Sequence, residues 1–347
     1  MILTNHIAYM ENLKELHIKE ADMPTLTQHD VLVKVEYVGI CGSDVHLFER
    51  GKIGDFIVEP PFVLGHEVSG TVEAVGESVQ GLQKGDRVAL EPGINCGQCK
   101  YCKHGKYNLC VDMQYLAAPP TDGALQRYMA YPENLCFKLP ESVSLEEGAL
   151  IEPFSVGLHA AKRGNVEMGK TVVILGAGSI GLVTLLASKA LGASNIIITD
   201  VIEKRLSFAK KLGAKMVVNS KHEDVESIVN KVTKGEGADI VIETAGAEIT
   251  IQQSAHLVAP GGTIVAVGLP PQEKVTFDFV TMINKEVDMK TVFRFRNKFD
   301  LAIDAIESGR VPLKEIITHE FNFFESQKAF DYVVENKEKV VKALIKY

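Results

Sequence analysis

The sequence predicts an α/β protein in which a β-rich first part precedes a doubly wound parallel sheet. Two observations carry this prediction. From about residue 171 to 267, continuous apolar runs alternate with amphipathic stretches, the pattern of a parallel sheet covered by helices on both faces. Before about residue 150, short segments of alternating apolar and polar residues are separated by glycine and proline, which is typical of half-buried strands joined by turns. A length of 347 residues is comfortable for two domains.

The expected strands of the first part are short, and three of them are clear. They are Val31–Val38, Gly70–Gly76 and Arg87–Leu90.

The second part begins after a helix-like stretch at Glu146–Ala161 and then repeats one strand–helix unit. The expected strands are Thr171–Leu175, Ile196–Thr199, Met216–Val218, Asp239–Ile242 and Thr263–Val267. The expected helices between them are Ile180–Leu191, Glu203–Leu212 and Asp224–Val232. After about residue 288 the alternation stops, and two further helices are expected at Phe299–Ser308 and Ser326–Leu344. We expect this last part to return to the first domain.

The composition excludes several classes of protein. Hydrophobic residues make up 46% and charged residues 24% of the chain, an ordinary globular mixture. A net charge of -8 does not fit a nucleic-acid binder, which needs a clustered basic face. Apolar runs are too short for a membrane span, and the stretch Met1–Glu20 lacks the apolar core of a secretion signal. We therefore expect a cytoplasmic protein.

A glycine-rich turn follows the strand at Thr171–Leu175. Gly176, Gly178 and Gly181 fit G-x-G-x-x-G, with Ile180 opening the next helix. The glycines permit a tight turn and a close approach of pyrophosphate to the helix N-terminus. Asp200 ends the next strand, nineteen positions after Gly181, where an acid binds the adenosine ribose and repels a 2′-phosphate. The segment predicts a dinucleotide site that favours NAD over NADP, and Arg205 is a candidate to cover the adenine.

Four of the six cysteines lie close together in the sequence. Cys96, Cys99, Cys102 and Cys110 form C-x2-C-x2-C-x7-C. Four thiolates suit a closed tetrahedral zinc ion that stabilises a loop, and an iron–sulfur cluster is the alternative. Because nothing nearby resembles an electron-transfer domain, we favour structural zinc.

A second group of potential metal ligands is sparser. Cys41 lies at the end of an expected strand, and His66 is followed directly by Glu67. A catalytic zinc ion needs three protein ligands and one open position for the substrate. Cysteine, histidine and a carboxylate can supply such a set, although each residue alone is unremarkable.

These residues resemble a known family. Gly65-His66-Glu67, followed by Gly70, Gly76 and Val79, reproduces G-H-E-x2-G-x5-G-x2-V, a specific signature of zinc-dependent medium-chain dehydrogenases/reductases. The resemblance continues along nearly the whole chain and is strongest to the sorbitol, or polyol, dehydrogenase branch. The segments that carry it are Ile40–His46 (ICGSDVH), Lys106–Cys110 (KYNLC), Gly148–Ala160 (GALIEPFSVGLHA) and Val292–Asn297 (VFRFRN).

The resemblance implies a β-rich, GroES-like catalytic domain built from both ends of the chain, with a Rossmann NAD-binding domain inserted. The implied ranges are 1–152, with a structural-zinc lobe at about 92–112, then 153–287, and a return at 288–347. It implies a catalytic zinc ion on Cys41, His66 and Glu67, with Glu152 as a carboxylate near the metal. NAD contacts are implied at Ile180, Asp200, Arg205, Val267, Gly268, Leu269, Val292 and Phe293, and substrate contacts at Arg294, Glu152 and Phe295.

Two positions depart from the polyol dehydrogenase pattern. Leu47 stands where an aromatic residue is common, and Phe295 stands where a tyrosine is common. Both line the substrate side in the family, so the preferred polyol stays open. The four-cysteine lobe is absent from animal enzymes and often present in bacterial ones, so the chain resembles the bacterial type.

The implied reaction is NAD-linked oxidation of a secondary hydroxyl of a polyol such as sorbitol, xylitol or iditol to a ketose. Zinc acts as a Lewis acid on the alcohol oxygen, and hydride passes to the nicotinamide. The proton leaves through Ser43 and His46 or by way of Glu152, and the sequence leaves both routes open.

Three alternative functions can be compared with this one. A threonine-type or butanediol-type dehydrogenase can use the same scaffold. A non-catalytic protein with this fold does not fit the intact Cys41, His66, Glu67 and Ser43. A nucleic-acid-binding zinc finger does not fit the acidic charge. The resemblance also implies a homotetramer or homodimer, a small-molecule polyol substrate, and no nucleic-acid or membrane partner.

Overall fold

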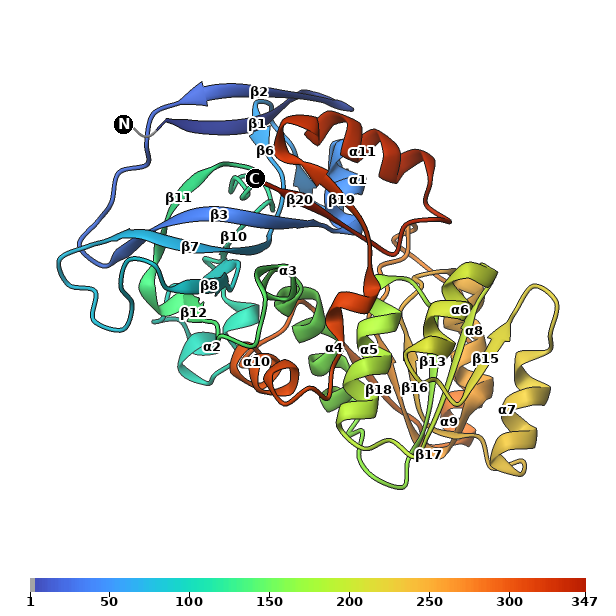
Figure 1. The fold of residues 1–347 in the computed structure, drawn as a ribbon. Coiled ribbons are helices and arrows are strands. Elements are labelled where there is room, and N and C mark those ends of the chain that lie inside the picture. Colours follow the sequence, from blue (N-terminus) through green and yellow to red (C-terminus); the bar gives the residue numbers. More distant parts are fainter. Residues whose placement is uncertain (1–3) are drawn as a thin grey trace. The chain divides into compact units, whose positions relative to one another are not determined.

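The structure, a computed structural model, describes residues 4–347. Its contacts divide the chain into two compact units. The first comprises residues up to Glu152 together with Phe299–Glu307 and Ile317–Tyr347, and the second comprises Pro153–Lys298 and Ser308–Ile316. Both ends of the chain therefore meet in the first unit, and the alternating strand–helix part forms the second (Figure 1).

The first unit is built on a seven-stranded sheet in the order β12-β8-β7-β3-β20-β19, with β11 also paired to β3. The strands are β3 (Asp30–Ile40), β7 (Glu67–Val75), β8 (Arg87–Leu90), β11 (Tyr128–Pro132), β12 (Cys136–Lys138), β19 (Ile317–Asn322) and β20 (Lys342–Lys346). The expected strands at 31–38, 70–76 and 87–90 fall within β3, β7 and β8, allowing one residue at an end. Val31, Val33 and Val35 of β3 pack into one buried core, because alternate side chains of a strand point to the same face.

Smaller elements complete this unit. A three-stranded sheet has the order β2-β1-β6, and two strand pairs, β4-β5 and β10-β9, lie apart from it. These strands are β1 (Asn5–Asn12), β2 (Glu15–Ala21), β4 (Lys52–Ile53), β5 (Phe56–Ile57), β6 (Phe62–Val63), β9 (Gly93–Ile94) and β10 (Gln114–Tyr115). The helices are α1 (Gly42–Arg50), α2 (Lys100–Lys103), α3 (Leu145–Ala149), α10 (Phe299–Glu307) and α11 (Ser326–Glu335), and α4 (Ile151–Arg163) leads into the second unit.

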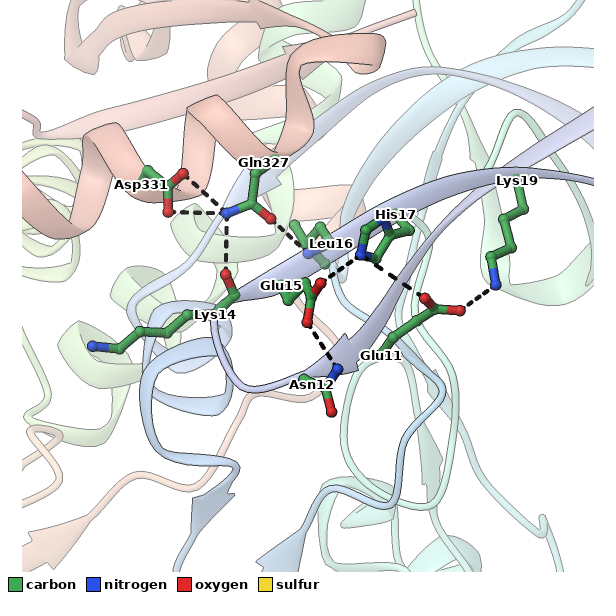
Figure 2. A network of polar contacts seen from close by, with 9 residues as sticks. All are labelled: Glu11, Asn12, Lys14, Glu15, Leu16, His17, Lys19, Gln327 and Asp331. Carbon is green, nitrogen blue, oxygen red and sulfur yellow. Dashed lines mark hydrogen bonds and ion pairs between the residues drawn. The ribbon is translucent and has the colours of Figure 1, made fainter.

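The amide side chain of Gln327, at the start of α11, links this helix to the turn between β1 and β2. Its Oε1 accepts the backbone N–H of Leu16 at 2.6 Å, and its Nε2 donates to the carbonyl of Lys14 at 3.1 Å. Asp331, one turn further along α11, accepts from the same amide (Figure 2). The turn between β1 and β2 is thereby fixed to a helix more than three hundred residues away in sequence.

The second unit holds a six-stranded parallel sheet in the order β15-β14-β13-β16-β17-β18. Numbered from the first strand of this unit, that order is 3-2-1-4-5-6, the Rossmann arrangement. The strands are β13 (Thr171–Leu175), β14 (Asn195–Asp200), β15 (Met216–Asn219), β16 (Ala238–Glu243), β17 (Val258–Ala266) and β18 (Asp288–Thr291). The helices are α5 (Ser179–Ala190), α6 (Glu203–Lys211), α7 (Val225–Thr233), α8 (Glu248–Leu257) and α9 (Phe279–Asn284). The predicted fold class is confirmed.

One secondary-structure prediction is wrong. The expected helix Ser326–Leu344 ends at Glu335, and Lys342–Lys346 form strand β20. A short apolar run fits a buried strand as well as a helix, and Ala343, Leu344 and Ile345 are fully buried between two partner strands.

The second compact unit continues past residue 287, where we expected the NAD-binding domain to end. Because β18 pairs with β17, residues 288–298 belong to the second unit. No helix within residues 4–347 is both long and apolar enough to cross a membrane.

Candidate functional site

The first candidate metal centre lies at the ends of two neighbouring strands. Cys41 follows β3 and caps α1, while His66 and Glu67 stand at the start of β7. One potential donor atom from each of these residues lies within 4.8 Å of the others. A thiolate, an imidazole and a carboxylate at this spacing fit a tetrahedral zinc ion with one position left for a further ligand. The three residues predicted as catalytic ligands are therefore brought together.

Asp44 orients His66. Its Oδ1 lies 3.4 Å from Nδ1 of His66 and accepts the backbone N–H of Gly65 at 3.0 Å. Its Oδ2 accepts the N–H of Cys41 at 2.9 Å. Burial would raise the pKa of Asp44, but the His66 ring and these N–H donors lower it below its ordinary value. Because Nδ1 is occupied, Nε2 of His66 is left to bind a metal.

Glu67 has a cationic partner. Nζ of Lys342, on β20, donates to both carboxylate oxygens of Glu67, at 2.6 and 2.8 Å. Burial would lower the pKa of Lys342, but Glu67 and Cys41 raise it above its ordinary value. This lysine was missed from the sequence, because it lies in the segment that we expected to be helical.

Glu152, at the start of α4, is a second buried carboxylate in this region. Its Oε1 accepts the phenol of Tyr115 at 2.8 Å, and the Tyr115 ring lies 5.9 Å from that of His66. Burial, opposed by His66 and reinforced by Glu67, raises the pKa of Glu152 to about 7. A carboxyl group with such a pKa can exchange a proton near neutral pH.

The two proposed relay residues lie on α1. Ser43 is half-buried in its first turn, and His46 is exposed three residues later. Residues at this spacing are neighbours on one helix face. Although His46 is exposed, partial desolvation of its ring and then Arg50 lower its pKa below the ordinary value. The ring is therefore neutral and able to accept a proton near pH 7.

The second candidate metal centre is the cysteine lobe. One Sγ from each of Cys96, Cys99, Cys102 and Cys110 lies within 4.8 Å of the others. The N–H of Cys99 donates to Sγ of Cys96 at 3.3 Å, and that of Cys96 donates to Sγ of Cys110 at 3.4 Å. Hydrogen bonds from the backbone and thiol of Cys102 lower the pKa of Cys99 to about 6. Four clustered sulfurs that accept backbone N–H groups fit a closed, structural zinc site.

The glycine-rich turn follows β13 in the second unit. Gly176 has a left-handed φ of 101°, and a Cβ at Gly181 would lie 1.9 Å from the Gly176 carbonyl oxygen. Gly178 caps α5, with Ile180 in the first turn of that helix. Only glycine fits these close approaches, so the turn leaves the helix N-terminus open to a phosphate.

Asp200 is tied to the same turn. Its Oδ2 accepts the N–H of Ala177 at 2.8 Å, and its Oδ1 accepts the N–H of Ile202 at 2.9 Å. Arg205 lies 3.8 Å from Oδ2. The acid, the glycine turn and the arginine are thus gathered at the carboxyl ends of β13 and β14, where open parallel sheets bind ligands.

A second pair of turns meets at the carboxyl ends of β16 and β17. Val267, Gly268 and Leu269 follow β17, and a Cβ at Gly268 would lie 2.2 Å from the N atom of Gly246. Glu243 was missed from the sequence. Its Oε1 accepts the N–H groups of Ala245 and Gly246, both at 2.9 Å, so this buried carboxylate shapes the turn against which residues 267–269 pack.

The VFRFRN segment lies in the second unit, after β18. Arg294 has a left-handed φ of 57° and its guanidinium lies 4.7 Å from the centre of the Phe293 ring. Phe295 is buried and Val292 is half-buried. A non-glycine residue with positive φ marks a constrained backbone of the kind that gathers at functional sites. The substrate and NAD contacts of this segment stay predictions.

Comparison with known proteins agrees with this geometry. Residues 27–141 match the family model of the alcohol dehydrogenase GroES-like domain, and residues 179–308 match that of the zinc-binding dehydrogenase. The chain is 41% identical to the sorbitol dehydrogenase of Bacillus subtilis, over 97% of this chain and 96% of the relative. It is 42% identical to the L-idonate 5-dehydrogenase of Vitis vinifera, over 94% and 91%.

A solved structure is also similar. An Escherichia coli oxidoreductase/dehydrogenase of unknown specificity superposes with a TM-score of 0.95 at 45% identity, over 99% of both chains. Two family models in the expected order and relatives that cover nearly the whole chain lead to one conclusion. The chain belongs to the polyol dehydrogenase branch of the zinc-dependent medium-chain dehydrogenases/reductases.

Proposed function

We propose that this dehydrogenase oxidises a secondary hydroxyl of a polyol to a ketone and transfers the hydride to NAD. The observation that carries the proposal is the convergence of Cys41, His66 and Glu67 within 4.8 Å. When bound, zinc supplies Lewis acidity to an alcohol oxygen, and NAD accepts a hydride. Relatives that are named for sorbitol and L-idonate support a polyhydroxylated substrate.

In this proposal the chain's own residues bind and move the proton. Ser43 receives the proton of the substrate hydroxyl, and His46, one turn away on α1, passes it to solvent. Glu152 is the alternative acceptor, because its pKa of about 7 suits proton exchange at neutral pH. Glu152 also binds a further hydroxyl of the substrate, which favours a polyol over ethanol, and Arg294 is proposed as another substrate contact.

The test is NADH formation at 340 nm with sorbitol, xylitol, L-iditol, L-idonate, ethanol, threonine and 2,3-butanediol, before and after chelation. We expect chelator-sensitive turnover on polyols with little on ethanol or threonine. Cys41→Ser should abolish it, whereas Cys136→Ser is the matched control, since Cys136 is buried outside both cysteine-containing groups. Turnover confined to threonine or butanediol would reject the polyol substrate.

We also propose two zinc ions per chain, one on Cys41, His66 and Glu67 and one on the four-cysteine lobe. Two thiolate-containing sites need reduced cysteines, and we propose a cytoplasmic location because that compartment keeps thiols reduced.

We further propose a homodimer or homotetramer. Phe279, Val280 and Ile283 of α9 are more than 60% exposed, and β18 stands at the end of the six-stranded sheet. Exposed edge strands and apolar side chains favour pairing with a second copy. Light scattering should show Ile283→Glu dissociating the oligomer, with Ile249→Glu, at a similarly exposed site on α8, as the control. Equal mass for both variants and the wild type would place the interface elsewhere.

A further inference from the structure

Lys342 is a lysine without access to solvent. Its side chain is 1% exposed, although lysine is almost never buried unless it is paired. Nζ donates to Oε1 and Oε2 of Glu67 at 2.6 and 2.8 Å and to the carbonyl of Ile40 at 3.2 Å. The three protons of the ammonium group therefore have three acceptors, and two of these belong to Glu67.

The register of the sheet produces this pair. Strand β3 lies between β7 and β20, with Gly39 opposite both Glu67 and Leu344. A Cβ at Gly39 would lie 1.9 Å from Oε2 of Glu67. The missing side chain of Gly39 leaves the space in which the carboxylate crosses β3 to meet Lys342. The register of these strands and the missing side chain of Gly39 therefore build the ion pair into the fold.

The same carboxylate is also a candidate metal ligand. A donor oxygen of Glu67 lies within 4.8 Å of donor atoms of Cys41 and His66. An ammonium group and a divalent cation both bind carboxylate lone pairs, and they repel each other strongly at short range in a buried site. Because Nζ already donates to both oxygens, a metal ion on either oxygen would share that oxygen with the lysine.

We infer that Lys342 is a positioning residue that holds Glu67 in the metal-free centre and competes with the metal for that carboxylate. This inference rests on the proposed function, in which Glu67 belongs to the catalytic zinc centre. Lys342 keeps the buried carboxylate of Glu67 compatible with folding before metal is bound. The same contact weakens the binding of metal by the completed centre.

The inference predicts opposite effects on folding and on metal binding. Lys342→Met should lower the melting temperature of the metal-free protein, because Glu67 loses its partner. The same change should tighten zinc binding at the Cys41 centre at least about tenfold, because the repelling charge is gone. A merely structural lysine would lower the melting temperatures of both forms equally and leave zinc affinity unchanged.

The experiment is a zinc titration of the full chain at pH 8 against a competing fluorescent chelator, with the melting temperature measured in both forms. Cys41→Ser identifies the binding that belongs to the four-cysteine lobe. Lys342→Arg should stay within about threefold of the wild-type affinity, since it keeps the positive charge and the hydrogen-bond donors. Lys346→Met is the matched control, an exposed lysine on the same strand.

A double-mutant cycle separates charge competition from general disturbance. In a Glu67→Gln background, Lys342→Met should change zinc affinity by less than about threefold, because the contested carboxylate is absent. If Lys342→Met does not fold, Lys342→Gln carries the same prediction, since it keeps donors without the charge. Unchanged affinity in the single variants, or equal changes with and without Glu67, would overturn the inference. Wild-type zinc stoichiometry equal to that of Cys41→Ser would instead reject the proposed function.

Discussion

The phenol of Tyr115 donates to Oε1 of Glu152 at 2.8 Å, joining the residue at the end of β10 to the start of α4. A second pair of the same chemistry exists in the cysteine lobe, where Tyr107 donates to Oε1 of Glu91, also at 2.8 Å. The two pairs differ in place, since only Tyr115 lies beside His66. This likeness allows a controlled test of what Tyr115 does for Glu152.

We expect Tyr115→Phe to lower kcat/KM for the polyol about fivefold to tenfold, because Glu152 loses a hydrogen bond to its charged form. Zinc content should not change, since Tyr115 is not a proposed ligand. Tyr107→Phe removes the matching bond in the lobe and should leave kcat/KM within about twofold. Steady-state kinetics and metal analysis of both variants decide the point. Equal losses of kcat/KM in Tyr115→Phe and Tyr107→Phe would show that Tyr115 acts only on stability.

The acid at the end of β14 gives a prediction about the cofactor. Asp200→Asn keeps the size of the side chain and removes the charge that repels a 2′-phosphate. We expect the KM for NAD to rise at least about tenfold and the preference for NAD over NADP to fall by a similar factor. Asp239→Asn is the control, because Asp239 accepts the N–H of Thr171 at the opposite end of β13. An unchanged NAD/NADP ratio in Asp200→Asn would contradict the assigned role.

The cysteine lobe gives a prediction about metal content. We expect Cys99→Ser to contain one zinc ion per chain where the wild type contains two, and to melt on the order of 10 °C lower. Part of the turnover should survive at 25 °C, because the lobe has no proposed chemical role. Cys136→Ser should keep both ions. Elemental analysis and differential scanning fluorimetry provide the readouts, and retention of both ions in Cys99→Ser would reject this ligand set.

Parts of the site that are local in sequence could be predicted from residues alone. The glycine turn and the four cysteines each lie within one short segment, so spacing indicates what they bind. Cys41 follows β3 and His66 precedes β7, and only the family resemblance joined them. The role of Lys342 could not be predicted from the sequence, because its contact with Glu67 spans 275 residues and depends on strand register. The apolar run around it was also assigned to a helix, which hid that register.

His159 on α4 is a buried histidine among cations. Burial, followed by Arg296, Lys298 and Arg163, lowers its pKa to about 4 from an ordinary value of 6.5. The unfolded chain therefore binds a proton between these pH values that the folded protein does not bind. The contribution of His159 to stability is complete above pH 6.5 and is lost as the pH falls through 4.

The wild-type free energy of unfolding should thus fall between pH 6.5 and 4 by on the order of 2 kcal/mol more than that of His159→Gln, which cannot take up this proton. Urea unfolding at several pH values, with metal removed from all proteins, measures the difference. His222→Gln is the control, because His222 is exposed in the same unit. If the three proteins lost stability in parallel on acidification, the cations near His159 would not be holding the ring neutral. If the free energy of unfolding depended less on pH in His159→Gln alone, the nearby cations would be shown to hold the ring neutral.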